Sequence, residues 1–173
     1  MVSVFHPTGI IKGTVQLPAS KSISNRALII REISGNGFTI TDLADSSDTQ
    51  TLFRLLSKRS NEYDCREGGT TFRFLLALKV LQGEECVLTG SDRMQKRPVK
   101  PLAEALNALG ADIHYLKDEG YPPLKINSER ISGSKVTVDA SVSSQFISAL
   151  MMIAPSLQGG LKINLKGEIV SES

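Results

Sequence analysis

Three polar segments, rich in serine, threonine or glycine, each precede a strongly apolar run. The polar segments are residues 20–24, 68–71 and 141–145, and the apolar runs that follow them are 27–30, 72–81 and 146–154. A helix that begins in such a segment exposes unpaired backbone N–H groups and the positive end of its dipole, and serine and threonine add hydroxyl groups. If the three helices run parallel, their starts share one face of the domain. The pattern therefore predicts an anion-binding surface.

Basic residues occur in or near the same segments. They are Lys21, Arg26, Arg73, Arg93, Lys96 and Arg97. Ser22 and Arg26 are four residues apart, so they share a helix face, and a guanidinium beside a hydroxyl suits phosphate or carboxylate. A serine at a helix start is often only a cap, and one opening alone would indicate no more than that. The joint occurrence of three openings and several cations favours an anionic ligand.

The composition narrows the classes of ligand and partner. Twenty lysines and arginines against 18 aspartates and glutamates give a net charge of +2, which does not indicate a nucleic-acid or membrane partner. Neither a Walker A sequence nor a Gly-x-Gly-x-x-Gly turn occurs, so nucleotide binding of those kinds is not expected. Cys65 and Cys86 stand apart from any Cys-x-x-Cys or histidine cluster, so neither a metal site nor a disulfide framework is predicted. A small phosphorylated metabolite fits best, but no residue pattern identifies the reaction.

Strand-like and helical segments alternate along the 173 residues, which favours one α/β or α+β domain. Strands are predicted at 13–17, 38–41, 86–89, 113–116, 135–138 and 161–165. Amphipathic outer helices are predicted at 49–58 and 99–109, whereas the three apolar runs predict helices buried on every side. The order suggests a three-fold repeated α/β unit whose third copy is incomplete. The sequence shows neither a basic leader nor an apolar span of about 20 residues, so a cytoplasmic location is expected.

Residues 17–28 read Leu-Pro-Ala-Ser-Lys-Ser-Ile-Ser-Asn-Arg-Ala-Leu, which resembles the N-terminal signature of the 5-enolpyruvylshikimate-3-phosphate synthase family. Later segments resemble the family in the same order, namely 69–73, 88–98, 119–124 and 142–146. The resemblance implies transfer of the enolpyruvyl group of phosphoenolpyruvate to the 5-hydroxyl of shikimate 3-phosphate, without a metal or organic cofactor. It also implies an enolpyruvyl transferase-like lobe of repeated βαβαββ units with buried parallel helices.

The same resemblance implies a set of site residues. Lys21 would lie between the two substrates, and Lys21 and Arg97 would be catalytic because they neutralise charge on the reacting groups. Gly69 and Arg97 would bind phosphoenolpyruvate. The implied contacts of shikimate 3-phosphate are Lys21, Ser22, Arg26, Ser143, Ser144, Gln145 and Ser171.

Two positions depart from the family's pattern. Glu67-Gly68 stands where the family usually has Asn-Ala, which would place a carboxylate near the phosphoenolpyruvate site. Phe74 stands where many members have proline, so the inhibitor response associated with that helix is not carried over.

The chain is less than half as long as a family member. The resemblance therefore implies that a second lobe is missing, and with it the residues taken as general acid and base. Residues 1–17 would form a strand region that packs with that lobe, and residues 18–173 would form a truncated N-terminal substrate-binding lobe. We expect this chain alone to bind shikimate 3-phosphate weakly at most and to show no turnover.

Two other functions compete with this expectation. One is a non-catalytic anion-binding or assembly module that uses the half-fold by itself. The other is a UDP-N-acetylglucosamine enolpyruvyl transferase, which normally has a Lys-Asn pair in the first motif and a reactive loop cysteine. Here Lys21 is followed by Ser22, and neither Cys65 nor Cys86 lies in that loop.

Overall fold

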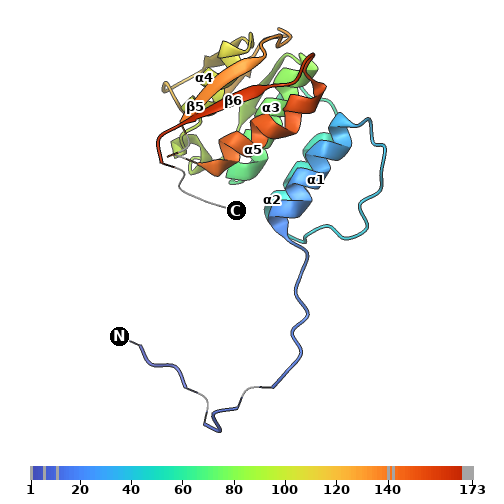
Figure 1. Cartoon of the computed structure of the whole chain (residues 1–173), viewed down its shortest axis with the longest axis vertical. Coiled ribbons are helices and arrows are strands. Elements are labelled where there is room, and N and C mark those ends of the chain that lie inside the picture. Colours follow the sequence, from blue (N-terminus) through green and yellow to red (C-terminus); the bar gives the residue numbers. More distant parts are fainter. Residues whose placement is uncertain (1, 6, 11, 140, 142, 169–173) are drawn as a thin grey trace.

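An apolar helix, α3 (Gly69–Gln82), forms the centre of the fold. The computed structural model describes residues 2–5, 7–10, 12–139, 141 and 143–168, and Figure 1 shows their arrangement. All of residues 71–80 are buried. Most side chains of this helix are apolar, and neighbouring elements cover every face of it. The helix ends at Gly83, whose left-handed backbone (φ 62°) allows the chain to turn away. The expectation of a helix buried on every side is confirmed here.

A four-stranded sheet packs beside α3. It contains β1 (Glu62–Asp64), β2 (Cys86–Thr89), β3 (Ile113–Tyr115) and β4 (Leu124–Ile126) in the order β1-β2-β4-β3. β1 and β2 are parallel and are joined through α3, whereas β4 is antiparallel to both β2 and β3. The short helix η1 (Met94–Lys96) and the amphipathic helix α4 (Lys100–Ala108) lie between β2 and β3. The elements from β1 to β4 therefore follow the order βαβαββ.

A second, two-stranded sheet carries the last helix. β5 (Lys135–Asp139) pairs in parallel with β6 (Lys162–Lys166), from Lys135 opposite Lys162 to Asp139 opposite Lys166. Parallel strands need a crossover connection. Here that connection is α5 (Ser144–Ile153) followed by the short helix η2 (Ala154–Ser156).

The two remaining helices, α1 (Lys21–Ile33) and α2 (Ser47–Leu56), pack against each other and against α3. The inner face of α1 is partly polar, because buried Ser24 accepts a hydrogen bond from the Ala44 N–H (2.9 Å) and buried Asn25 accepts one from Thr49 (2.8 Å). These bonds attach α1 to the start of α2 and to the segment before it.

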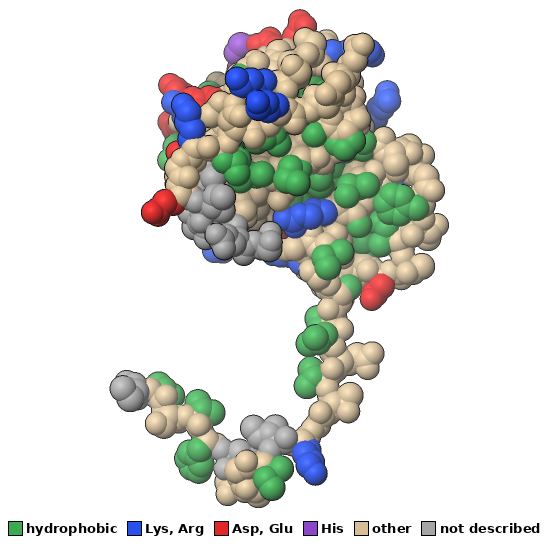
Figure 2. Space-filling model, in the orientation of Figure 1, with side chains coloured by type: hydrophobic (Ala, Val, Ile, Leu, Met, Phe, Trp, Pro, Cys, Tyr) green, Lys and Arg blue, Asp and Glu red, His purple; other side chains and the backbone are tan. Residues whose placement is uncertain are grey.

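The prediction that α1 and α5 are buried on every side was wrong. Ile23 and Ile30 of α1 are 70% and 45% exposed, and Met151 of α5 is 61% exposed. Both helices pack through one face only, and no element among the described residues covers the other. Figure 2 shows several hydrophobic side chains on this side of the molecule.

The predicted strands at 13–17 and 38–41 were also wrong. Both segments lack strand hydrogen bonds, and Val15 and Leu17 are 79% and 81% exposed. In Figure 1 the N-terminal segment leads away from the body of the fold. Alternating apolar residues suit a strand, but a strand also needs a neighbour, and the described residues supply none there. Because α1 and α2 come without strands, the three-fold repeat stays a prediction. The described part contains no helix with the length and apolar character of a membrane span.

Both cysteines are free and buried, so we expect neither to react in the folded chain. Cys65 and Cys86 are 0% and 3% exposed, and burial raises the pKa of the Cys65 thiol far above its usual range and that of Cys86 to about 12. Thiolate is the reactive form, so a thiol reagent at pH 8 should label neither residue until the chain is unfolded in urea. Labelling of either cysteine at the rate of the unfolded chain would contradict this burial.

Candidate functional site

Four helices begin at the same end of the molecule. Lys21, the first residue of α1, forms an ion pair with Asp48 of α2 (3.2 Å), and the Thr71 hydroxyl of α3 donates to the Asp48 carbonyl (3.1 Å). Arg73 of α3 donates to the Gln145 side chain of α5 (2.7 Å). Residues in the first two turns of α1, α2, α3 and α5 thus contact one another. This confirms that the three polar openings lie on one face, where their helix dipoles present positive ends together.

Two guanidinium groups converge on Gly69, the first residue of α3. A Cβ atom placed on Gly69 would lie 2.6 Å from Nη1 of Arg97 and 3.0 Å from Nη1 of Arg73. Only glycine leaves room for both cations at the helix start. Two like charges this close repel each other unless an anion lies between or beside them. The sequence-predicted residues Gly69 and Arg97 are therefore brought together, and Arg73 joins them.

Arg73 is buried, with 8% of its surface exposed. Besides Gln145 it donates to the Pro98 carbonyl (3.2 Å), and its guanidinium lies over the Phe146 ring at 5.1 Å from the centroid. Its Nε is buried without a hydrogen-bond partner. Burial, and secondly the charge of Arg97, lower the pKa of Arg73. A bound anion would relieve both effects.

Arg26 lies one turn further along α1, half-buried between the helices. It donates to the Ser22 carbonyl (3.0 Å) and to the Ser148 hydroxyl of α5 (3.0 Å). Its guanidinium carbon is 5.4 Å from the centroid of the Phe74 ring on α3. This cation is thus placed by α1, α3 and α5 together.

No carboxylate among the described residues pairs with Arg26, Arg73 or Arg97. Most other cations near the site have one: Lys21 pairs with Asp48, and Arg93 pairs with Glu67 at 3.5 Å. Glu67, which we expected near phosphoenolpyruvate, is 62% exposed in its side chain and faces Arg93. Three cations without a counter-charge at one end of a helix cluster have the charge that suits a multiply charged anion.

The serine residues of the site have different roles. The Ser143 hydroxyl caps α5 by accepting a hydrogen bond from the Gln145 N–H (3.3 Å), and the Gln145 side chain holds Arg73. Ser22 and Ser144 are exposed at the starts of α1 and α5, so their hydroxyls are free to meet a ligand. The predicted contact Ser171 lies outside the described residues.

Two residues of the candidate site, Arg73 and Ser148, were not predicted as site residues from the sequence. Arg73 is one of the cations near the polar segments, and its spacing of four residues from Gly69 indicates the same helix face. Ser148 follows Ser144 by four residues, which is the same signal on α5. Within the described ranges no group of three histidine, cysteine or acidic residues is arranged to hold a metal ion.

Comparison with solved structures gives the class of fold. Two structures of EPSP synthase from Acinetobacter baumannii match this chain with TM-scores of 0.75 and 0.76, over 90% of this chain and 41% of theirs, at 18% identity. The α/β fold of this chain is thus like that of part of EPSP synthase.

Sequence comparison then gives the family. The EPSP synthase (3-phosphoshikimate 1-carboxyvinyltransferase) family model matches residues 5–58 and 54–173, and this chain belongs to that family. A 3-phosphoshikimate 1-carboxyvinyltransferase of Bacteroides fragilis is 47% identical over 161 residues, which are 93% of this chain and 39% of that protein. One of Sulfurovum sp. is 38% identical over 96% of this chain and 45% of its own length. The chain therefore spans less than half the length of these curated relatives.

Proposed function

We propose that this chain is the N-terminal, substrate-binding part of an enzyme that transfers the enolpyruvyl group of phosphoenolpyruvate to the 5-hydroxyl of shikimate 3-phosphate. The observation that carries the proposal is the cluster of Arg26, Arg73 and Arg97, which has no carboxylate partner among the described residues. Both substrates are phosphorylated carboxylates, so each presents two anionic groups to such a cluster. Family membership identifies these two anions as the ones to test first.

We divide the site residues between the two ligands. We assign shikimate 3-phosphate to Lys21, Ser22, Arg26, Ser143, Ser144, Gln145 and Ser171. Phosphoenolpyruvate goes to Gly69 and Arg97, where Arg73 adds a second guanidinium. Lys21, at the start of α1, would lie between the two ligands, and it becomes available to them when its exposed ion pair with Asp48 opens.

The reaction needs charge stabilisation and proton transfer. The 5-hydroxyl gives up its proton and its oxygen adds to C2 of phosphoenolpyruvate while a proton goes to C3. Loss of phosphate from C2 and of a proton from C3 of the tetrahedral intermediate then restores the double bond. Arg97 and Lys21 would hold the negative groups of the reactants in place throughout, a role that fixed cations perform best where water is excluded. No electron is gained or lost overall, so the step calls for no redox cofactor.

We further propose that the proton-transfer groups come from the part of the relatives that this chain does not span. That part is then a required partner, residues 1–17 pack with it, and the chain alone shows no turnover. Neither a nucleic acid nor a membrane is part of the proposal. Two free cysteines fit the reducing cytoplasm, which we propose as the location.

Binding of shikimate 3-phosphate to the 173-residue chain tests the proposal. We expect a weak but saturable change in the amide NMR spectrum, and a loss of affinity of about tenfold in Arg26→Ala and in Ser144→Ala, because each removes a hydrogen-bond donor at the site. Arg54→Ala, on the exposed face of α2, is the matched control and should bind like the original chain. Equal titrations in all of these proteins, or none at all, would remove the assignment of this ligand.

Addition of the complementary C-terminal part of the Bacteroides fragilis relative tests the activity. We expect phosphate release only when both parts, phosphoenolpyruvate and shikimate 3-phosphate are present. Release with UDP-N-acetylglucosamine as acceptor would instead support the amino-sugar transferase. If the two parts associate and yet no phosphate is released with either acceptor, a non-catalytic anion-binding module becomes the better reading.

A further inference from the structure

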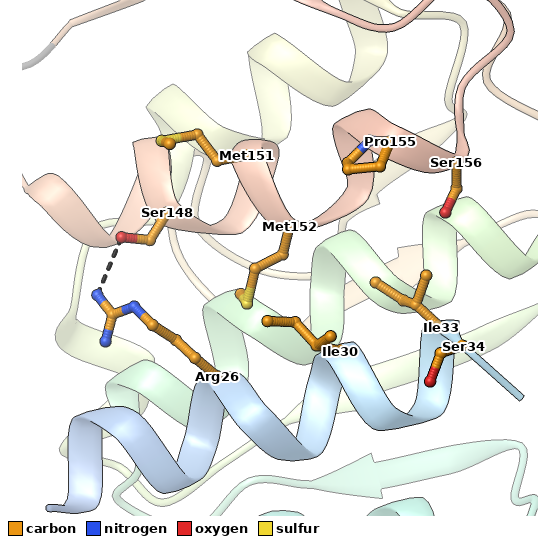
Figure 3. A pocket seen from close by; sticks show the side chains of 9 residues that line it. All are labelled: Arg26, Ile30, Ile33, Ser34, Ser148, Met151, Met152, Pro155 and Ser156. Carbon is orange, nitrogen blue, oxygen red and sulfur yellow. Dashed lines mark hydrogen bonds between the residues drawn. The ribbon is translucent and has the colours of Figure 1, made fainter. Parts of the chain in front are cut away.

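Arg26 occupies one end of an apolar groove between α1 and α5. The groove has a volume of about 570 Å³ and is lined along its length by Ile30 and Ile33 of α1 and by Met151 and Met152 of α5. Figure 3 shows the Arg26 side chain reaching across to Ser148 at this end, while Ser34 and Ser156 lie at the opposite end. A guanidinium that points along the groove would meet apolar side chains over most of its length.

Ser148 is the side chain that keeps Arg26 at the end nearest the helix starts. Its hydroxyl accepts a hydrogen bond from Nη2 of Arg26 at 3.0 Å, and both residues are half-buried, so water competes less than at the surface. Phe74 supports the same orientation from α3, with its ring centre 5.4 Å from the guanidinium carbon. Ser22, the other hydrogen-bond partner, contributes only its backbone carbonyl and belongs to the same helix.

This arrangement leaves the donors of Arg26 in a fixed direction. A guanidinium has five N–H donors in a planar fork, and the two hydrogen bonds to Ser22 and Ser148 use two of them. Because the fork is planar, fixing Nη1 and Nη2 also fixes the direction of the remaining N–H groups. Those donors then meet an anion without a further loss of side-chain freedom, which is the advantage of preorganisation.

We propose that Ser148 is a positioning residue of the site: it holds Arg26 in the orientation that receives the anion, without touching the anion itself. The identity of that anion as shikimate 3-phosphate rests on the proposed function. The orientation of Arg26 does not, because the contacts with Ser148 and Phe74 exist in the chain without any ligand.

Two measurements on Ser148→Ala test the proposal. The first is the NMR signal of the Arg26 Nε–H group in the ligand-free chain, which is assigned by its disappearance in Arg26→Lys. We expect a sharp signal displaced by the Phe74 ring in the original chain, and an undisplaced, averaged signal in Ser148→Ala. The second is titration with shikimate 3-phosphate, where we expect about a fivefold loss of affinity in Ser148→Ala. Ser148→Thr, which keeps the hydroxyl, should restore both results.

Ser156→Ala is the matched control, because it removes a serine hydroxyl from the far end of the same groove. It should change neither the Arg26 signal nor the titration. An Arg26 signal in Ser148→Ala identical to that of the original chain would overturn the proposal, as would an unchanged affinity. If no protein binds shikimate 3-phosphate, the proposed function fails, and the Arg26 signal alone still decides whether Ser148 positions this cation.

Discussion

Replacement of Lys79 with methionine is expected to lower the free energy of unfolding by about 3 kcal/mol. Lys79 lies on α3 at the end away from the anion site, with 5% of its surface exposed. Its Nζ contacts the Glu84 carboxylate (2.8 Å) and the Tyr63 hydroxyl (2.9 Å), and it lies 4.3 Å from the centre of the Tyr63 ring. Methionine fills the same space but leaves Glu84 as a largely buried carboxylate without its ion-pair partner.

Urea unfolding measures this loss, and Lys125→Met provides the control. Lys125 also pairs with a glutamate, Glu85, at 3.4 Å, but both side chains are well exposed, so its replacement should cost less than about 1 kcal/mol. A double variant, Lys79→Met with Glu84→Leu, should recover much of the stability because it removes the unpaired charge as well. Equal losses in Lys79→Met and Lys125→Met would show that the buried network has no special weight.

The effect of Lys79→Met should also depend on pH. Burial raises the pKa of Glu84, but hydrogen bonds from Lys79 and Tyr63 outweigh this and lower it below the ordinary value of 4.5. A carboxylate with a lowered pKa stabilises the fold above its ordinary value, and that stabilisation is lost as the pH falls through the folded pKa. The difference in stability between the original chain and Lys79→Met should therefore be largest near neutral pH and shrink in acid.

Replacement of Arg97 with methionine should weaken phosphoenolpyruvate binding by about a hundredfold, which corresponds to about 2.7 kcal/mol. The Arg97 side chain has no hydrogen-bond or ion-pair partner in the described part of the chain, and its Nη1 points to the start of α3 beside Gly69. Its charge is therefore available to a ligand. Because the substitution also removes the repulsion between Arg97 and Arg73, the variant should unfold at the same or a slightly higher urea concentration than the original chain.

Two further variants separate the charge of Arg97 from its position. Arg93→Met removes a cation from the same loop, but one that is exposed and paired with Glu67, so phosphoenolpyruvate binding should change little. Gly69→Ala keeps Arg97 but places a methyl group 2.6 Å from its Nη1, so the guanidinium must move and binding should weaken. Binding by Arg97→Met that equals binding by the original chain in an NMR titration would remove Arg97 from the site.

The sequence predicted the helix starts of the site because their signals are local. A serine or glycine before an apolar run determines where a helix begins, and the repeated pattern at residues 20–24, 68–71 and 141–145 correctly placed three of them on one face. The contact between Arg73 and Gln145, by contrast, joins residues 72 positions apart. No local spacing predicts such a pair, since it depends on how α3 and α5 pack.

The wrong predictions also come from tertiary packing, which the local sequence does not show. Residues 13–17 have the alternation of a strand, and α1 and α5 have the apolar character of fully buried helices, yet each also requires a neighbour that the described residues do not provide. Propensity indicates what a segment can form, whereas tertiary partners decide what it does form. The strands β1 and β4 were missed for the opposite reason: three residues are too few to show a periodicity, but they pair well beside β2.

The enclosure of α3 makes this chain indivisible. An apolar helix that is packed on every side is not stable while half of its neighbours are absent. The sheet, α1, α2 and α5 must therefore assemble around α3 in a single cooperative event. A piece that lacks α5, or α1 and α2, would leave part of α3 facing water. Deletions that remove β5 to β6, or α1 and α2, would therefore yield an aggregating polypeptide and not a smaller working domain.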